Sequence, residues 1–183
     1  MSPSLRLSLL LLLTVLAAPA RSAPPHIVLI VADDLGWTDL ACFGSGYHRT
    51  PHLDRLARDG MRFTSTYTCG PNCAPTRACL MSGQYSPRHG VYTVGSGARG
   101  MAKLRQLVPV PNKTVLDADI VTLAETLRVA GYSTSHFGKW HLGSPPMAGP
   151  KQQGFEINFG GNRTGSPRGG YITPYESAGE DAT

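Results

Sequence analysis

Residues 71–83 read P-N-C-A-P-T-R-A-C-L-M-S-G, a C-x-P-x-R unit that opens a short apolar run. Pro75 suits the first turn of a helix, because its φ angle is fixed and it has no backbone N–H. Gly83 suits the left-handed residue that follows a helix end. Cys73 is therefore predicted just before a helix N-terminus, where backbone N–H groups and the helix dipole favour a bound anion. Arg77 adds a planar cation that pairs with tetrahedral oxyanions, so the stretch predicts a thiol beside an anion site.

A second informative stretch lies upstream. Residues 26–32 read H-I-V-L-I-V-A, a continuous β-branched and aliphatic run. The run has no polar alternation, so we expect a strand buried on both faces, as in a parallel sheet. Asp33 and Asp34 follow at once, at the carboxyl end of the strand, where α/β folds bind ligands. Two adjacent carboxylates supply hard oxygen ligands for Ca²⁺ or Mg²⁺, and a solvated turn is the alternative.

Between these stretches the pattern predicts a helix and a strand. Residues 50–60 have the order of a compact helix, with Thr50 as its cap, Pro51 at its first position and Gly60 at its end. Residues 61–67 alternate in polarity and predict a strand that leads into the cysteine loop.

Downstream, a second strand end carries basic side chains. Thr122 and Glu125 have the spacing of a capping box, for a helix that ends at Gly131. Residues 132–137 are expected to form the next strand, and residues 138–143 follow it as G-K-W-H-L-G. A cation and an imidazole therefore lie at this strand end, and an ordinary loop is the alternative interpretation.

The remaining segments give weaker signals. Residues 94–112 are rich in glycine, proline and basic residues and predict an irregular excursion. His89 and His136 are expected to have structural roles, the first in a loop and the second inside the predicted strand.

Residues 71–83 closely resemble the first signature of the sulfatase family. In that family the motif cysteine is oxidised to formylglycine, whose hydrated aldehyde is the nucleophile. Asn72 and Ser82 are less usual choices at their positions, and neither carries the chemistry. The residues that match the signature are Cys73, Pro75, Thr76, Arg77, Leu80, Met81 and Gly83.

The resemblance runs from about Ile27 to Phe159. An apolar strand followed by Asp-Asp-x-Gly is similar to the start of a sulfatase. The family's second signature is similar to residues 131–134 (G-Y-S-T) and 138–141 (G-K-W-H), although Phe137 is bulkier than the residue usual there. Residues 154–156 resemble the Gly-Phe-acid segment that follows.

This resemblance implies an α/β fold of the alkaline phosphatase-like type, in which helices sandwich a mostly parallel sheet. It implies an enzyme that hydrolyses aryl or carbohydrate sulfates, after a formylglycine-generating or maturase enzyme has converted the cysteine. Its substrates would be sulfated small molecules or polysaccharides. The implied catalytic residues are Cys73, Arg77, Lys139 and His141. The implied ligands of Ca²⁺ or Mg²⁺ are Asp33, Asp34 and Cys73.

Two other functions compete with this one. A phosphodiesterase or phosphonate hydrolase of the same superfamily would use the same aldehyde, and activity on sulfate against phosphate esters separates the two. A catalytically inactive protein that only binds carbohydrates or anions would leave Cys73 unmodified and bind no metal. The intact set of expected site residues counts against this third reading.

Residues 1–22 have the order of a secretory signal peptide: a basic start, an apolar middle and a small-residue exit. The apolar run is short for a membrane anchor. We therefore expect a secreted or periplasmic protein without a stable membrane span. Without residues 1–22, which hold two arginines and no acid, the formal net charge falls from +5 to +3. This surplus contains no Lys/Arg run and argues against nucleic acid as the main partner.

The four cysteines are Cys42, Cys69, Cys73 and Cys79. The last three could be read as zinc ligands, but their spacings are not the paired C-x-x-C of structural zinc sites. An exported chain permits disulfides, and the pairing stays open.

The C-terminal third offers no further strand end with a pair of metal ligands. Two carboxylates alone leave Ca²⁺ short of the six or more oxygens that it takes. We therefore expect residues 23–183 to be the N-terminal part of a longer catalytic domain, inactive when expressed alone.

Overall fold

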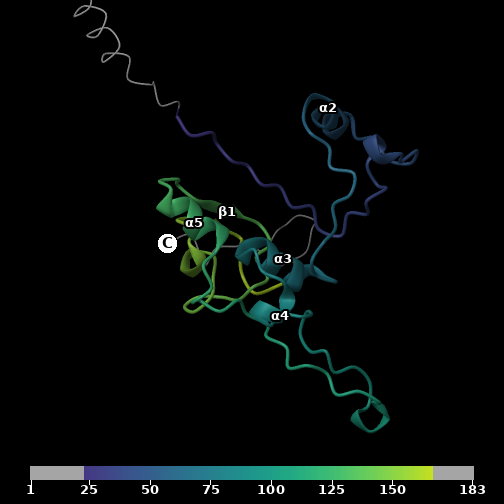
Figure 1. Cartoon of the computed structure of the whole chain (residues 1–183), viewed down its shortest axis with the longest axis vertical. Helices are drawn as coiled ribbons and strands as arrows, with labels where there is room; N and C mark the ends of the chain where they lie inside the picture. The colour runs from purple at the N-terminus through teal and green to yellow at the C-terminus, as the bar shows by residue number, and fades with distance from the viewer. Residues whose placement is uncertain (1–22, 167–183) are drawn as a thin grey trace, which may run out of the picture. The chain divides into compact units, whose positions relative to one another are not determined.

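The computed structural model describes residues 23–166, and the predicted signal peptide at residues 1–22 lies outside the described residues. The chain divides into two units, with the boundary between Trp37 and Thr38. Within residues 23–166, the helices and strands all belong to the second unit (Figure 1). In chain order they are η1 (Ala41–Phe43), α2 (Pro51–Asp59), α3 (Cys73–Ser82), α4 (Ser86–His89), η2 (Ala102–Leu104), α5 (Leu123–Val129), β1 (Ser135–Phe137), η3 (Lys151–Gln153) and β2 (Ile157–Phe159).

The prediction of a buried strand over residues 26–32 is wrong. The segment is extended, but no described residue forms a ladder with it, and Val28 and Ile30 are each 83% exposed. An apolar β-branched run has the composition of a buried strand, yet a strand exists only where a neighbour accepts and donates its backbone hydrogen bonds. The strand predicted over residues 61–67 is absent from the described structure for the same reason.

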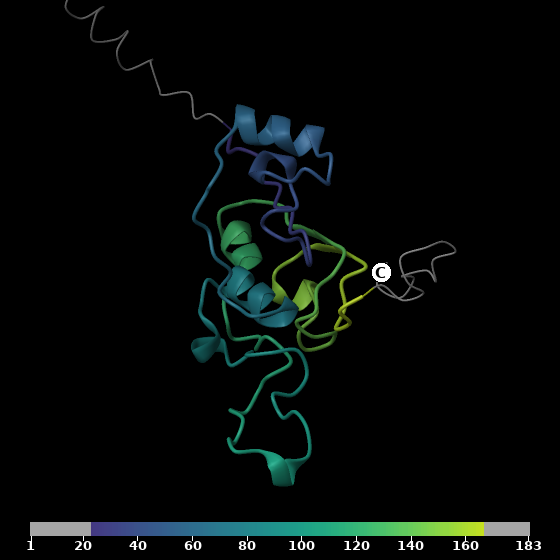
Figure 2. The same cartoon turned by 90° about the vertical axis from the view of Figure 1, so that its right-hand side faces the viewer.

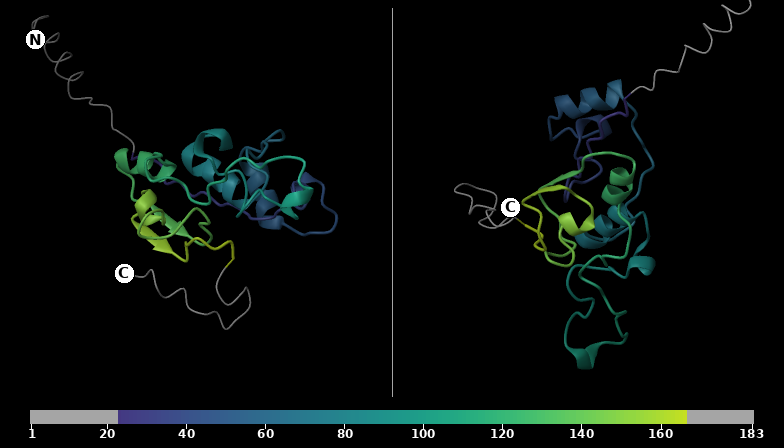
Figure 3. Two further views of the ribbon diagram at one scale, coloured as in Figure 1. Left: turned by 90° about the horizontal axis from the view of Figure 1, so that it is seen from below. Right: turned by 90° about the vertical axis from the view of Figure 1, so that its left-hand side faces the viewer.

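The sheet of the second unit consists of β1 and β2, which run parallel. Ser135 pairs with Ile157, and Phe137 pairs with Phe159. The two strands lie side by side in Figure 3, joined by a connection that contains η3. β1 is shorter than the predicted strand over residues 132–137. The parallel pair, with helices before it and within its connection, confirms the α/β class.

Helix α5 begins with the predicted capping box. The backbone N–H of Glu125 donates to Thr122 Oγ1 (3.2 Å), and Glu125 Oε2 accepts from the N–H of Thr122 (2.7 Å). Thr122 Oγ1 also donates to the carbonyl of Gln153 (2.6 Å), and Gln153 Nε2 donates to the carbonyl of Leu116 (3.0 Å). Because Thr122 and Gln153 are buried, these hydrogen bonds fix the start of α5 against η3, and η3 against Leu116.

Helix α2 differs from its prediction at one detail. It spans Pro51–Asp59, as the sequence indicated, but the Thr50 side chain does not cap it. The Thr50 hydroxyl instead donates to Asp54 Oδ1 (2.9 Å) and accepts from the N–H of Ala41 (2.9 Å). Asp54 Oδ1 also accepts from the N–H of Cys42 (2.8 Å), so these side chains tie η1 to α2.

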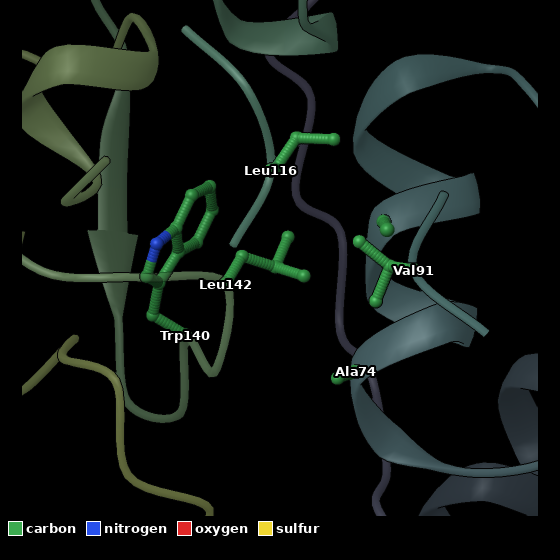
Figure 4. Packing of buried hydrophobic residues seen from close by; sticks show 6 residues of the cluster. Ala74, Val91, Leu116, Trp140 and Leu142 are labelled. Atoms are coloured by element: carbon green, nitrogen blue, oxygen red, sulfur yellow. The ribbon is translucent and has the colours of Figure 1, made fainter. Parts of the chain in front are cut away.

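The hydrophobic core of the second unit lies between α3 and the segment after β1. Figure 4 shows the indole of Trp140 and the side chain of Leu142 facing Leu116, with Val91 and Ala74 opposite. Trp140 is 1% exposed, and its Nε1 donates to the carbonyl of Ala148 (2.9 Å). Burial of each large aliphatic side chain contributes about 1.5–3 kcal/mol. The core therefore fixes residues 138–143, which carry two expected site residues, beside the helix that begins at Cys73.

Residues 94–112 form the predicted irregular excursion, whose only described helix is η2 near its tip (Figure 2). Asn112 closes its base: Oδ1 accepts from the N–H groups of Tyr92 (2.7 Å) and Thr93 (3.0 Å), and Nδ2 donates to the carbonyl oxygens of Thr93 (3.0 Å) and Gly95 (2.6 Å). The Asn112 side chain thus joins the two ends of this irregular segment.

Candidate functional site

Cys73 is the first residue of α3 and is half-buried. The helix begins two residues earlier than Pro75 suggested, so Cys73 lies inside the first turn rather than before it. Pro75 is tolerated there because the first N–H groups of a helix have no intrahelical acceptor. Gly83 follows the helix with φ +65°, the left-handed conformation that the sequence predicted.

Arg77 joins this helix to the loop that follows β1. Its guanidinium Nη1 donates a hydrogen bond to the backbone carbonyl of Lys139. Both residues are half-buried. The structure therefore brings together two expected catalytic residues that lie 62 positions apart in the chain.

His141 is held in an unusual backbone conformation. Its φ angle is +64°, in the left-handed region, which costs a non-glycine residue about 1–3 kcal/mol. The N–H of His141 donates to the carbonyl of Asn162 (2.9 Å). The backbone of Gly165 packs against the imidazole, because a Cβ there would lie 2.8 Å from Cε1 of His141. The contacts with Asn162 and Gly165 thus fix the position of the half-buried His141 side chain.

Asp33 and Asp34 lie in a turn directly after the extended segment and are exposed. Asp34 has φ +56°, a conformation that aspartate tolerates better than most residues. Two adjacent carboxylates are the oxygen donors that a hard cation prefers, and further oxygens are needed to complete its coordination. Both aspartates belong to the first unit of the chain, so a shared metal site with Cys73 stays a prediction.

A buried thiol–imidazole pair lies behind the helix, and sequence reasoning missed it. Cys79 Sγ and His89 Nε2 are 3.3 Å apart. His89 Nδ1 accepts from the N–H of Val91 (3.1 Å), so we assign the imidazole proton to Nε2, which donates to the sulfur. The thiol in turn donates to the carbonyl of Cys69 (3.7 Å).

Both members of this pair are neutral at pH 7. Burial, reinforced by the neighbouring Cys69 thiol, raises the pKa of Cys79 to about 11. Burial also lowers the pKa of His89. Because the thiolate is the reactive form, Cys79 is a structural rather than a reactive cysteine. No local spacing rule links a cysteine to a histidine ten residues later, so the sequence carried no signal for this contact.

His136 has the structural environment that its place in β1 indicated. Its Nδ1 lies 3.3 Å from Asn158 Oδ1, and its ring meets the rings of Trp140 and Phe155 edge-on, each with centroids 5.3 Å apart. Burial lowers the pKa of His136, against a smaller raising effect of Asn158.

A pocket of about 500 Å³ lies next to the expected site. Ala74, the neighbour of Cys73, and His141 both line it. Val94 and Val115 form part of an aliphatic wall, and Arg163 adds a second basic side chain. The pocket has no acidic lining residue among those described, so its charge favours an anion.

Across residues 23–166, no helix combines the length and apolar composition needed to cross a membrane.

Comparisons with known proteins agree on one family. The family model described as Sulfatase matches residues 25–175. The chain is 41% identical to rat N-acetylgalactosamine-6-sulfatase over 146 residues, which cover 79% of this chain and 27% of the relative. It is 44% identical to human arylsulfatase A over 152 residues, which cover 82% of this chain and 28% of the relative. The chain therefore spans little more than a quarter of the length of these relatives.

Among solved structures, the chain is similar to Ps i-CgsB in complex with k-i-k-neocarrahexaose. The TM-score is 0.56 at 32% sequence identity, and the match covers 70% of this chain and 26% of that chain. This likeness confirms the predicted fold class.

Proposed function

This chain belongs to the sulfatase family, and from that membership we propose that it supplies the nucleophile and the anion-binding side chains of a sulfuric ester hydrolase. The observation that carries the proposal is the hydrogen bond from Arg77 to the carbonyl of Lys139. It places the C-x-P-x-R helix and the G-K-W-H loop at one location, as a site built from both would require.

Cys73 is the nucleophile after its oxidation to formylglycine, in this proposal. The hydrated aldehyde supplies two hydroxyl groups on one carbon. One attacks sulfur, and the other then loses its proton so that the carbon–oxygen bond to sulfate breaks and the aldehyde returns. The first turn of α3 surrounds Cys73 with backbone N–H groups that attract the anionic ester.

Arg77 and Lys139 stabilise the negative charge on the sulfate oxygens. Since Arg77 already donates to the Lys139 carbonyl, its guanidinium is oriented before the substrate binds. His141, fixed by its backbone bond to Asn162 and by the Gly165 backbone, orients the ester or protonates the departing oxygen. Such preorganisation avoids reorientation of the charged groups during the reaction.

Asp33 and Asp34 are the residues of this chain that would hold Ca²⁺ or Mg²⁺, together with the modified Cys73. Their exposed, adjacent carboxylates fit a hard cation by donor type. When bound, the metal polarises the sulfate and the attacking hydroxyl. Metal analysis of the protein against its Asp33→Ala variant tests this, and equal metal content in both would contradict the assignment.

We further propose that residues 1–22 direct export to a secreted or periplasmic location, where the substrates are sulfated small molecules or polysaccharides. N-terminal sequencing of the exported protein tests this proposal. A mature chain that still begins at Met1 would contradict it.

Conversion of Cys73 is the decisive experiment for the function. The chain is produced in a host whose formylglycine-generating enzyme converts another sulfatase in parallel. Trypsin releases residues 63–77, a peptide that contains Cys69 and Cys73. We expect an aldehyde at Cys73 that reacts with hydrazide, and an intact thiol at Cys69 as the internal control.

An unconverted Cys73 in that host would contradict the proposal. So would turnover of bis(p-nitrophenyl) phosphate without turnover of p-nitrophenyl sulfate by the converted protein. Cys73→Ser is the matched variant, because serine has no second hydroxyl with which to expel sulfate.

A further inference from the structure

The pocket lined by Ala74 and His141 has an arginine in its lining that the proposed reaction does not use. Besides His141, its lining includes Arg163, whose exposed side chain makes no ion pair or hydrogen bond with any residue between 23 and 166. Resting on the proposed function, we propose that Arg163 recognises a second anionic group of the substrate. The preferred substrate is then a sulfated saccharide with a carboxylate or a second sulfate on the sugar next to the reacting ester.

The backbone fixes Arg163 at the edge of the pocket. Its N–H donates to Ser144 Oγ (3.2 Å), and the preceding carbonyl of Asn162 accepts from the N–H of His141 (2.9 Å). The N–H of Thr164 donates to Asn162 Oδ1 (2.8 Å), which closes the turn. Residues 162–164 are therefore attached to the same loop that carries His141. The backbone of Arg163 is therefore fixed before an anion binds, so only its side-chain rotamers have to be ordered on binding.

The size and walls of the pocket agree with a sugar rather than a bare anion. Its volume of about 500 Å³ lies within the range typical of small-molecule sites. Val94, Val115 and Met147 provide apolar surface for the C–H face of a ring. Asn112 holds the wall at residues 93–95 in place through its hydrogen bonds to the backbone there. An inorganic sulfate ion would leave this apolar wall without a contact.

Arginine suits the proposed role chemically. Its planar guanidinium forms two parallel hydrogen bonds with a carboxylate or a sulfate, and such charge-assisted bonds are about twice as strong as neutral ones. Ala74, the neighbour of Cys73, and Arg163 line the same pocket, so a ligand that fills this pocket contacts both of them.

Binding measurements with matched ligands test the inference. In a Cys73→Ala background, where no ligand is turned over, we compare galactose 6-sulfate, a disaccharide that joins it to a uronic acid, and the same disaccharide with the carboxylate reduced to an alcohol. Isothermal titration at constant ionic strength gives each Kd. We expect the carboxylate to tighten binding about tenfold over the reduced disaccharide.

Arg163→Gln should abolish this gain and leave the affinity for galactose 6-sulfate within about twofold, since it removes only the second contact. Arg88→Gln is the control for charge, because Arg88 is exposed and does not line the pocket. It should leave the gain unchanged.

A carboxylate effect that persists in Arg163→Gln, or that Arg88→Gln also removes, would overturn the inference. Failure of all three saccharides to bind would overturn it as well. The proposed function is judged separately, by conversion of Cys73. Its failure is therefore distinguishable from a failure of the anion preference alone.

Discussion

The Arg77 guanidinium is bound to the main chain of Lys139, so one expected catalytic side chain orients the backbone of the other. This contact crosses from the helix that begins at Cys73 to the loop that follows β1. It adds a polar contact to the burial of Trp140 and Leu142, which also holds this loop in place.

Arg77→Lys should therefore lower the free energy of unfolding by about 1–3 kcal/mol, because a flexible ammonium does not reproduce the fixed guanidinium donor. Urea unfolding followed by circular dichroism measures the change. Arg88→Lys, at an exposed position, is the matched control and should stay within about 0.5 kcal/mol of the native protein. Equal effects of the two variants would show that the contact is not important for stability.

Cys79 should resist alkylation in the native protein. With a pKa of about 11, about one thiol in a thousand is ionised at pH 8, and burial blocks access to it. Iodoacetamide at pH 8 should modify the exposed Cys69 long before Cys79. In concentrated urea both should react at similar rates, which provides the control. Similar rates in the native state would refute the buried thiol–imidazole pair.

His89 should make the protein less stable in acid. Burial lowers its pKa below the ordinary value of 6.5, so the unfolded chain binds a proton more readily than the fold does. The stability that comes from neutral His89 is present above pH 6.5 and is lost as the pH falls toward the lowered pKa. Burial also lowers the pKa of His136, so His136 adds a loss of stability in acid of the same sign.

Unfolding free energies at pH 8 and pH 5 measure this dependence. The loss between them should be smaller in His89→Gln, which cannot titrate, than in the native protein. His52→Gln changes an exposed histidine and should keep the native loss. A pH dependence that is unchanged in His89→Gln would contradict the prediction.

Thr122→Ala should destabilise the protein by about 1–3 kcal/mol. It removes the N-cap of α5 and also the buried hydrogen bond to the Gln153 carbonyl. Thr122→Ser keeps the hydroxyl and should recover most of the loss. Thermal unfolding of both variants distinguishes the hydroxyl from the methyl group, and equal melting temperatures would assign the effect to packing instead.

The sequence predicted α2, α3 and α5 because their signals are local, but the loop expected around His89 is wrong, since residues 86–89 form α4. The capping box at Thr122, the end of α3 before Gly83 and the bounds of α2 each depend on residues within one or two turns. Thr50 shows the limit of such rules. Its hydroxyl donates to Asp54 Oδ1 and does not cap the helix as predicted.

Strands and site contacts were harder to predict, because they depend on partners far away in the chain. Residues 26–32 have the right composition for a buried strand, but no described segment pairs with them. The parallel partner of β1 starts 22 positions after it. The contact from Arg77 to Lys139 spans 62 positions and could be expected only through the resemblance to sulfatases.

The attachment of the turn at residues 162–164 has an evolutionary consequence. The two bonds that hold its backbone to the His141 loop use the carbonyl of Asn162 and the N–H of Arg163, not the side chain of Arg163. Nearly any amino acid at position 163 keeps those main-chain groups. Single substitutions there can therefore explore new ligand preferences while the loop that carries His141 keeps its geometry. The residue proposed to set specificity can therefore change under selection while the backbone bonds to the His141 loop remain.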